Sequence, residues 1–123
     1  AEDVQFIRTE NGRPLYETVI RSTAKWGTPD DLMFVVGATR PEVLAEVRAL
    51  VPGHFLLVPG VGAQGGDLQA VLKAGITADG GLLINSSRGV LYAGQGDQSI
   101  PAARAAAQSL QREMALALSA AVG

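Results

Sequence analysis

The chain contains no cysteine, which excludes disulfide bonds and thiolate metal sites. It has no apolar run close to the roughly 20 residues that cross a bilayer. Residues 1–4 lack the basic and apolar regions of a signal peptide. The formal net charge is only −2 and no basic run occurs, which argues against a nucleic-acid partner. We therefore expect a cytoplasmic protein with no membrane or nucleic-acid partner.

Short apolar runs are the clearest features that the chain does contain. They cover residues 32–36, 55–58 and 82–84, and none of them alternates with polar residues. Continuous apolar runs of this length are typical of parallel strands that are buried on both faces. With 47% apolar and 18% charged residues, the composition is that of an ordinary globular protein with a core.

Amphipathic stretches separate these runs and predict four helices. The first covers residues 14–26. The second follows Thr39-Arg40-Pro41-Glu42, a capping box with proline in the first turn, and ends at residues 52–53. Asp67 can cap the third helix, and the fourth begins near Pro101 with Ser99 as a possible cap.

Strands that alternate with helices imply βαβ units and a parallel sheet. Three strands alone would leave two exposed apolar edges, which stable proteins avoid. A complete (β/α)8 barrel takes about 250 residues, or roughly 31 for each unit. The 123 residues then predict a single partial domain over residues 1–123, the C-terminal half of a TIM barrel with roughly strands 6–8.

Two polar, flexible segments follow the last two predicted strands. In (β/α)8 barrels the loops after strands 7 and 8 often bind phosphate. Residues 60–66 contain four glycines, which let a backbone approach a ligand, and Gln64 can both donate and accept hydrogen bonds. In the second segment Ser86 and Ser87 offer hydroxyl groups, and Arg88 can hold two phosphate oxygens at once.

Either segment alone is equally compatible with a structural turn or a surface ion pair. The two in succession favour a phosphate site, and residues 36–39 could line the same mouth. Other candidates are weaker. His54 is expected at the surface, Thr39 as a cap rather than a ligand contact, and Tyr16 and Trp26 against the first helix. Tyr92 could fold over a ligand or pack in the core.

Three motifs resemble the orotidine 5′-phosphate decarboxylase family, particularly its longer bacterial branch. The resemblance runs from about residue 14 to residue 92, and residues 1–5 resemble the stretch after that branch's Ser-Asn-Pro segment on strand 5. The motifs are Val-Val-Gly-Ala-Thr-Arg-Pro-Glu at 35–42, Leu-Val-Pro-Gly-Val-Gly-Ala-Gln-Gly-Gly-Asp at 57–67, and Leu-Ile-Asn-Ser-Ser-Arg-Gly-Val at 83–90.

The resemblance implies a homodimeric (β/α)8 barrel that converts orotidine 5′-phosphate to uridine 5′-phosphate and CO₂ in pyrimidine synthesis, with neither metal nor organic cofactor. It implies that Gln64 bridges the phosphate and the pyrimidine and that Arg88 grips the phosphate. Backbone around Gly62, Gly65 and Ser87 would complete the phosphate site.

The family's catalytic Asp-x-Lys-x-x-Asp pattern does not occur in these 123 residues. The resemblance therefore implies that the N-terminal half of the same barrel is a partner and supplies the catalytic groups. Two alternatives stay open. The chain could belong to another phosphate-binding barrel, a lyase or isomerase, or it could be a non-catalytic half-barrel that binds phosphorylated ligands.

Overall fold

The computed structural model describes residues 2–62 and 64–123. Ala1, where the N-terminal resemblance begins, and Ala63, within the glycine-rich segment, lie outside the described residues. In chain order the elements are α1 (Glu2–Gln5), α2 (Leu15–Thr23), β1 (Met33–Val35), α3 (Pro41–Leu50), β2 (Phe55–Pro59), α4 (Leu68–Gly75), β3 (Leu82–Asn85), α5 (Ser87–Leu91), the 3₁₀ turn η1 (Gly96–Gln98) and α6 (Ser99–Val122).

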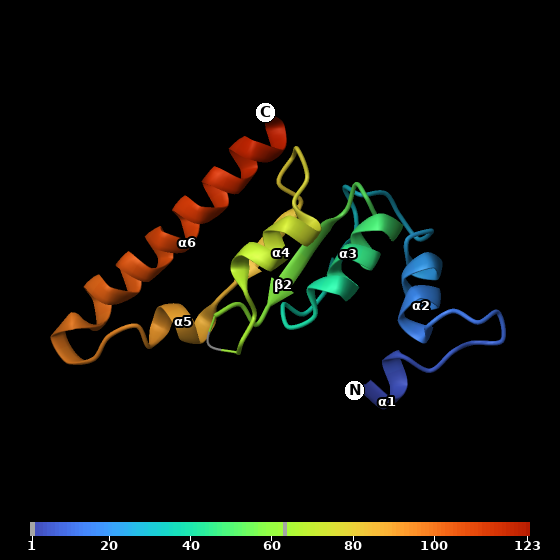
Figure 1. Cartoon of the computed structure of the whole chain (residues 1–123), viewed down its shortest axis with the longest axis horizontal. Helices are drawn as coiled ribbons and strands as arrows, with labels where there is room; N and C mark the ends of the chain where they lie inside the picture. The colour runs from blue at the N-terminus through green and yellow to red at the C-terminus, as the bar shows by residue number, and fades with distance from the viewer. Residues whose placement is uncertain (1, 63) are drawn as a thin grey trace.

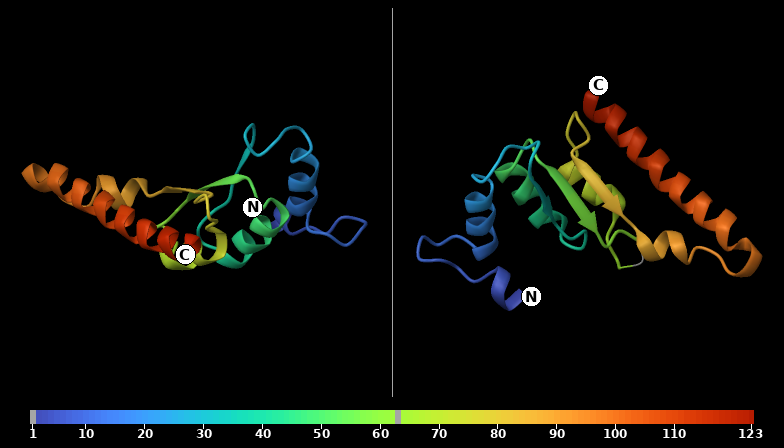
Figure 2. Two further views of the ribbon diagram at one scale, coloured as in Figure 1. Left: turned by 90° about the horizontal axis from the view of Figure 1, so that it is seen from above. Right: turned by 180° about the vertical axis from the view of Figure 1, so that it is seen from behind.

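The three strands form one parallel sheet in the order β1-β2-β3. Met33 pairs with Phe55, and Pro59 pairs with Asn85 at the carboxyl end of the sheet. Helices α3 and α4 lie together on one side of this sheet, as the front and rear views show (Figures 1 and 2). The predicted α/β fold with three parallel strands is therefore confirmed.

The hydrophobic core lies between the sheet and helices α3 and α4. Leu56 and Val58 of β2 and Leu44 of α3 and Val71 of α4 each have 0% of their surface exposed. Successive strand residues point to opposite faces, so only alternate residues reach this core. Burying such aliphatic side chains contributes about 1.5–3 kcal/mol each and holds the two layers together.

The opposite face of the sheet is bare. Its side chains are apolar and partly or largely exposed: Met33 at 50%, Val35 at 68%, Phe55 at 36% and Leu83 at 45%. The prediction that all three strands are buried on both faces is therefore wrong. In the described part of the chain the helices that pack on the sheet cover only one side of it.

Helix starts show which sequence signals were reliable. Asp67 caps α4 as predicted, because its Oδ1 accepts hydrogen bonds from the backbone N–H of Gln69 at 2.9 Å and of Ala70 at 3.4 Å. Thr39 is not a cap, since α3 starts after Arg40 and no side-chain cap bond forms there. Pro41 lacks an N–H group, which leaves one donor fewer for a cap to satisfy.

Two residues lie elsewhere than predicted. His54 is buried, with 8% exposure, and its ring contacts that of Phe34 at a centroid distance of 5.4 Å. It shares the alternation of Leu56 and Val58 and therefore points to the helix-covered face of the sheet. Trp26 is 77% exposed, because α2 ends at Thr23 and the tryptophan lies in the turn beyond it.

The longest helix, α6, runs along the outer side of α4 (Figure 1). Leu110 and Met114 pack against the core, and Gln69 Nε2 donates to Glu113 Oε2 at 2.8 Å. Leu116 stays 73% exposed, so α6 also presents an uncovered side. None of the helices in the described residues combines the length and the apolar character that crossing a membrane requires.

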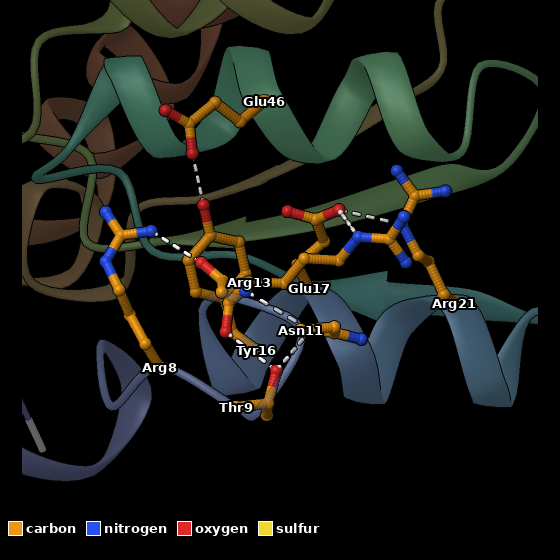
Figure 3. Close-up of polar contacts among 9 residues, drawn as sticks. Arg8, Thr9, Asn11, Arg13, Tyr16, Glu17, Arg21 and Glu46 are labelled. Carbon is orange, nitrogen blue, oxygen red and sulfur yellow. Dashed lines mark hydrogen bonds and ion pairs between the residues drawn. The ribbon is translucent and has the colours of Figure 1, made fainter.

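Polar contacts tie α2 to α3 near the N-terminus (Figure 3). The Tyr16 ring contacts Phe6 edge-on at a centroid distance of 5.7 Å, and its hydroxyl donates to Glu46 Oε2. Glu17 forms ion pairs with Arg21 at 2.8 Å and with Arg13 at 3.5 Å. Tyr16 therefore connects its own helix, α2, to Phe6 of the N-terminal segment and to Glu46 of α3.

Burial and then the hydrogen bond to Glu46 raise the pKa of Tyr16 from 10.0 to about 12. The folded chain thus holds the phenol proton more tightly than the unfolded chain. The resulting stabilisation is present below pH 10 and is lost as the pH rises through the folded-state pKa of about 12. Phenolate absorbance measured in a Tyr92→Phe background should show this titration. Adding Glu46→Gln should lower the pKa; an unchanged titration would contradict the role of Glu46.

Candidate phosphate-binding site

A hollow of about 190 Å³ lies at the carboxyl ends of β2 and β3. Its lining comes from both of the segments that the sequence singled out: Pro59, Gly60, Val61, Gln64, Asn85, Ser86, Ser87 and Arg88. Parallel pairing of β2 and β3 places their two carboxyl ends side by side. Gln64 and Arg88, separated by 24 positions, therefore line the same cavity.

The segment after β2 closes on itself through backbone hydrogen bonds. Gly66 N–H donates to the carbonyl of Gly60 at 3.0 Å, Gly62 N–H to Gly66 at 2.9 Å, and Gly65 N–H to Gly62 at 2.8 Å. Gly60, Gly62 and Gly65 have φ values of +94°, +81° and +89°, which favour glycine. Gly62 and Gly65 thus shape the loop that carries Gln64, and neither is among the cavity lining.

The segment after β3 continues directly into α5, a short helix that the sequence did not predict. Ser86 Oγ donates to the carbonyl of Val61 at 3.1 Å and so joins the two loops. Ser87 Oγ donates to Asn85 Oδ1 at 2.8 Å. Both serine hydroxyl protons are therefore engaged within the protein.

Among the described residues that line the cavity, several carry side-chain donors and none is acidic. Arg88 brings a guanidinium, and Gln64 and Asn85 bring amide groups. Asn85 was not singled out by sequence reasoning as a site residue. The available signal was its position as the polar end of an apolar strand. An arginine with two amides suits an anionic group with several oxygen atoms.

Residues 36–39 do not line this cavity, although the sequence suggested that they could. Ala38 N–H donates to the carbonyl of Pro59 at 2.9 Å, and Ala38 is buried at 1% exposure beneath the glycine loop. Val36, Gly37 and Thr39 instead line a separate hollow of about 250 Å³ beside β1.

The remaining candidates lie away from the site. His54 precedes β2, so it is at the amino end of that strand. Tyr92 is 76% exposed and is not among the cavity lining, so it does not pack in the core. Within residues 2–62 and 64–123, no three or more histidine, aspartate or glutamate side chains gather into a potential metal site.

Sequence comparison finds close relatives over almost the whole chain. Orotidine 5′-phosphate decarboxylase of Bacteroides fragilis is 44% identical over 115 residues, which covers 94% of this chain and 42% of the relative. The protein of the same name from Christiangramia forsetii is 48% identical, with the same coverage of 94% and 42%. No family model matches the chain.

Solved structures agree with these relatives. The structure of Leishmania donovani OMP decarboxylase superposes with a TM-score of 0.72 at 36% identity, over 92% of this chain and 43% of that chain. The chain thus spans 42% of the length of the two curated relatives. The resemblance predicted from the three motifs is confirmed.

Proposed function

From this relationship to the C-terminal half of the orotidine 5′-phosphate decarboxylases, we propose that the chain forms the phosphate-binding part of such an enzyme. The complete enzyme would release CO₂ from orotidine 5′-phosphate and leave uridine 5′-phosphate. The observation that supports this proposal most is that Gln64 and Arg88 line one cavity at the carboxyl ends of two parallel strands.

Each predicted site residue then has a role that its position allows. Arg88 holds two phosphate oxygens, and the amide of Gln64 donates to the phosphate while it also reaches the pyrimidine side. Gly62 and Gly65 keep the loop in the shape that presents Gln64. Ser87, at the start of α5, supports the opposite wall of the cavity.

Phosphate binding of this kind contributes to catalysis although the phosphate does not react. Binding energy from a remote part of a substrate can be used to hold the reacting part as it approaches the transition state. The reacting groups themselves would lie outside this chain, because its 123 residues contain no Asp-x-Lys-x-x-Asp pattern.

The bare face of the sheet supports a partner that carries those groups. We propose that residues 1–123 are one partial domain and that the N-terminal half of the same barrel covers Val35, Phe55 and Leu83. Exposed apolar patches of this kind on a sheet mark an interaction surface. The free edges of β1 and β3 would pair with strands of that half, as barrel closure requires.

Complementation tests this division of roles. The chain and an N-terminal half from a curated relative are produced separately, mixed, and assayed for loss of orotidine 5′-phosphate. Neither half should decarboxylate the substrate alone, whereas the mixture should. Decarboxylation by this chain alone would contradict the proposed partner. A completed barrel protected from thermal unfolding by a sugar phosphate, and not by uridine 5′-phosphate, would favour another phosphate-binding enzyme.

Arg88→Ala should weaken the completed enzyme strongly. Loss of a hydrogen-bonded charge costs about 1.5–3 kcal/mol, which corresponds to a roughly 10- to 150-fold fall in kcat/KM. Arg88→Lys should recover only part of this, because an ammonium group cannot bind two oxygens in the planar geometry of arginine. The matched control is Arg104→Ala, at an exposed position of α6. An unchanged kcat/KM in Arg88→Ala would rule out the proposed phosphate contact.

The homodimer, the cytoplasmic location and the absence of a metal or organic cofactor, all expected above, stay predictions.

A further inference from the structure

The hydroxyl protons of the two cavity serines already form hydrogen bonds within the protein, so they are not available to a ligand. Ser86 Oγ–H is bonded to the Val61 carbonyl at 3.1 Å, and Ser87 Oγ–H to Asn85 Oδ1 at 2.8 Å. Each hydroxyl has one proton to donate. The side-chain donors left for an anion are therefore the guanidinium of Arg88 and the amides of Gln64 and Asn85.

Asn85 is held in one orientation by this arrangement. Its Oδ1 accepts the Ser87 hydroxyl proton, so its Nδ2 group, with two N–H donors, is the end of the amide that is free to meet a ligand. Asn85 is exposed, ends β3, and pairs in register with Pro59, and both residues line the cavity. The amide therefore stands between the two loop segments that carry Gln64 and Arg88.

The size and lining of the cavity indicate which part of a nucleotide it takes. Its volume of about 190 Å³ lies below the roughly 300–1,000 Å³ of pockets that enclose a whole small molecule. A hollow of this size holds one polar group, and its lining offers an arginine, two amides and no carboxylate. The phosphate monoester fits this chemistry.

We propose that Asn85 is a third side-chain donor to the phosphate and that Ser87 is a positioning residue that orients the Asn85 amide. This inference rests on the proposed function. It assigns the Ser87 side chain an action through Asn85, with no direct contact between its hydroxyl proton and the ligand. A phosphate monoester would then accept from one guanidinium and two amides, and these donors favour it over a nucleoside that lacks the phosphate.

The test measures binding of uridine 5′-phosphate and of uridine to the completed enzyme by calorimetry or competitive inhibition. Asn85→Ala should weaken uridine 5′-phosphate about tenfold, the lower end for a hydrogen bond to a charged group, and leave uridine unchanged. Asn85→Asp should weaken it further, because a carboxylate replaces a donor and repels the phosphate. Asn11→Ala, in the exposed N-terminal hairpin, is the control and should bind as the unmodified protein does.

A double-mutant cycle tests the role of Ser87. Ser87→Ala should weaken uridine 5′-phosphate when Asn85 is present and should add nothing in the Asn85→Ala background. Additive effects would show that Ser87 acts independently of Asn85 and would overturn its assignment. Equal loss for uridine and uridine 5′-phosphate in Asn85→Ala would place Asn85 at the nucleoside and overturn the phosphate contact.

Arg88→Ala separates failure of this inference from failure of the proposed function. If Arg88→Ala weakens uridine 5′-phosphate and Asn85→Ala does not, the inference is wrong and the phosphate site stands. If neither variant changes binding, the proposed phosphate site fails together with the inference.

Discussion

Replacing Arg48 with alanine should remove about 1.5–3 kcal/mol from the free energy of unfolding, the scale of losing hydrogen bonds made by a charged group. Arg48 lies in α3, and its Nε donates to the Gly75 carbonyl at 2.8 Å, at the end of α4. Its Nη1 donates to the backbone carbonyl of His54 at 2.6 Å, and its Nη2 donates to the backbone carbonyl of Gly81 at 2.7 Å. These two carbonyls lie just before β2 and β3. One guanidinium thus joins two helices and the starts of two strands.

The expected loss is large because it has two parts. The hydrogen bonds of the guanidinium disappear, and the half-buried carbonyl of Gly75 loses its donor, whereas the Gly81 carbonyl keeps the backbone N–H of Leu56 at 2.9 Å. Burial lowers the pKa of the Arg48 guanidinium, so desolvation opposes its charge, and the hydrogen bonds to the carbonyl groups offset part of that cost. The free energy of unfolding of a folded domain is typically about 5–15 kcal/mol, so this loss would be a substantial part of the stability.

Urea unfolding followed by circular dichroism measures the effect of Arg48→Ala. Arg48→Lys should recover little, because one ammonium group cannot reach acceptors on so many segments. Arg21→Ala is the matched control: Arg21 also lies on a helix but forms an exposed ion pair with Glu17 at 2.8 Å. Such a pair contributes about 0.3–0.5 kcal/mol. Equal losses in Arg48→Ala and Arg21→Ala would show that Arg48 does not connect the layers.

Gly66→Ala should abolish most phosphate binding. A Cβ atom at this position would lie 2.5 Å from Ala38 Cβ and 2.5 Å from the Gly60 carbonyl oxygen, so the backbone must move. Gly66 closes the loop that carries Gln64, through its hydrogen bonds with Gly60 and Gly62. Overpacking costs about 1–3 kcal/mol of stability. Displacement of a binding group by about 1 Å can lower kcat/KM by about 100-fold.

Gly37→Ala is the control for this prediction. Its added Cβ meets no atom within 4 Å, and no left-handed φ is present at Gly37. It should therefore leave both stability and kcat/KM nearly unchanged. Protection of Gly66→Ala from thermal unfolding by uridine 5′-phosphate, at the same level as in the unmodified chain, would contradict the role of the loop.

The order and type of most elements could be predicted from the sequence, because local signals determine them. Each apolar run became a strand, and each capping or breaking residue lies near a helix end, as Asp67 illustrates. The placement of Gln64 and Arg88 at one cavity was also predictable, since neighbouring parallel strands bring their carboxyl ends together. The prediction needed only the order of the segments and the rule for such sheets.

Other features depended on the direction in which side chains point and on contacts between segments that are remote in the sequence. No single segment specifies either of these. His54 became buried because it follows the strand alternation toward α3 and α4, whereas its neighbours in sequence suggested a surface turn. The capping box at Thr39 failed because Arg40 precedes the helix and pairs with Glu42 at 3.2 Å. Asn85 became a cavity residue only once β3 was paired with β2.

The amino-acid sequence by itself thus determined the α/β alternation, the glycine loop and the two polar segments after the strands. Their residue types restrict the backbone and supply the donors regardless of what packs on them. The tertiary structure alone decided which face of the sheet is covered and which hydroxyl protons are already engaged. It also decided that Arg48 joins four segments, because burial and hydrogen bonding depend on neighbours that are remote along the chain.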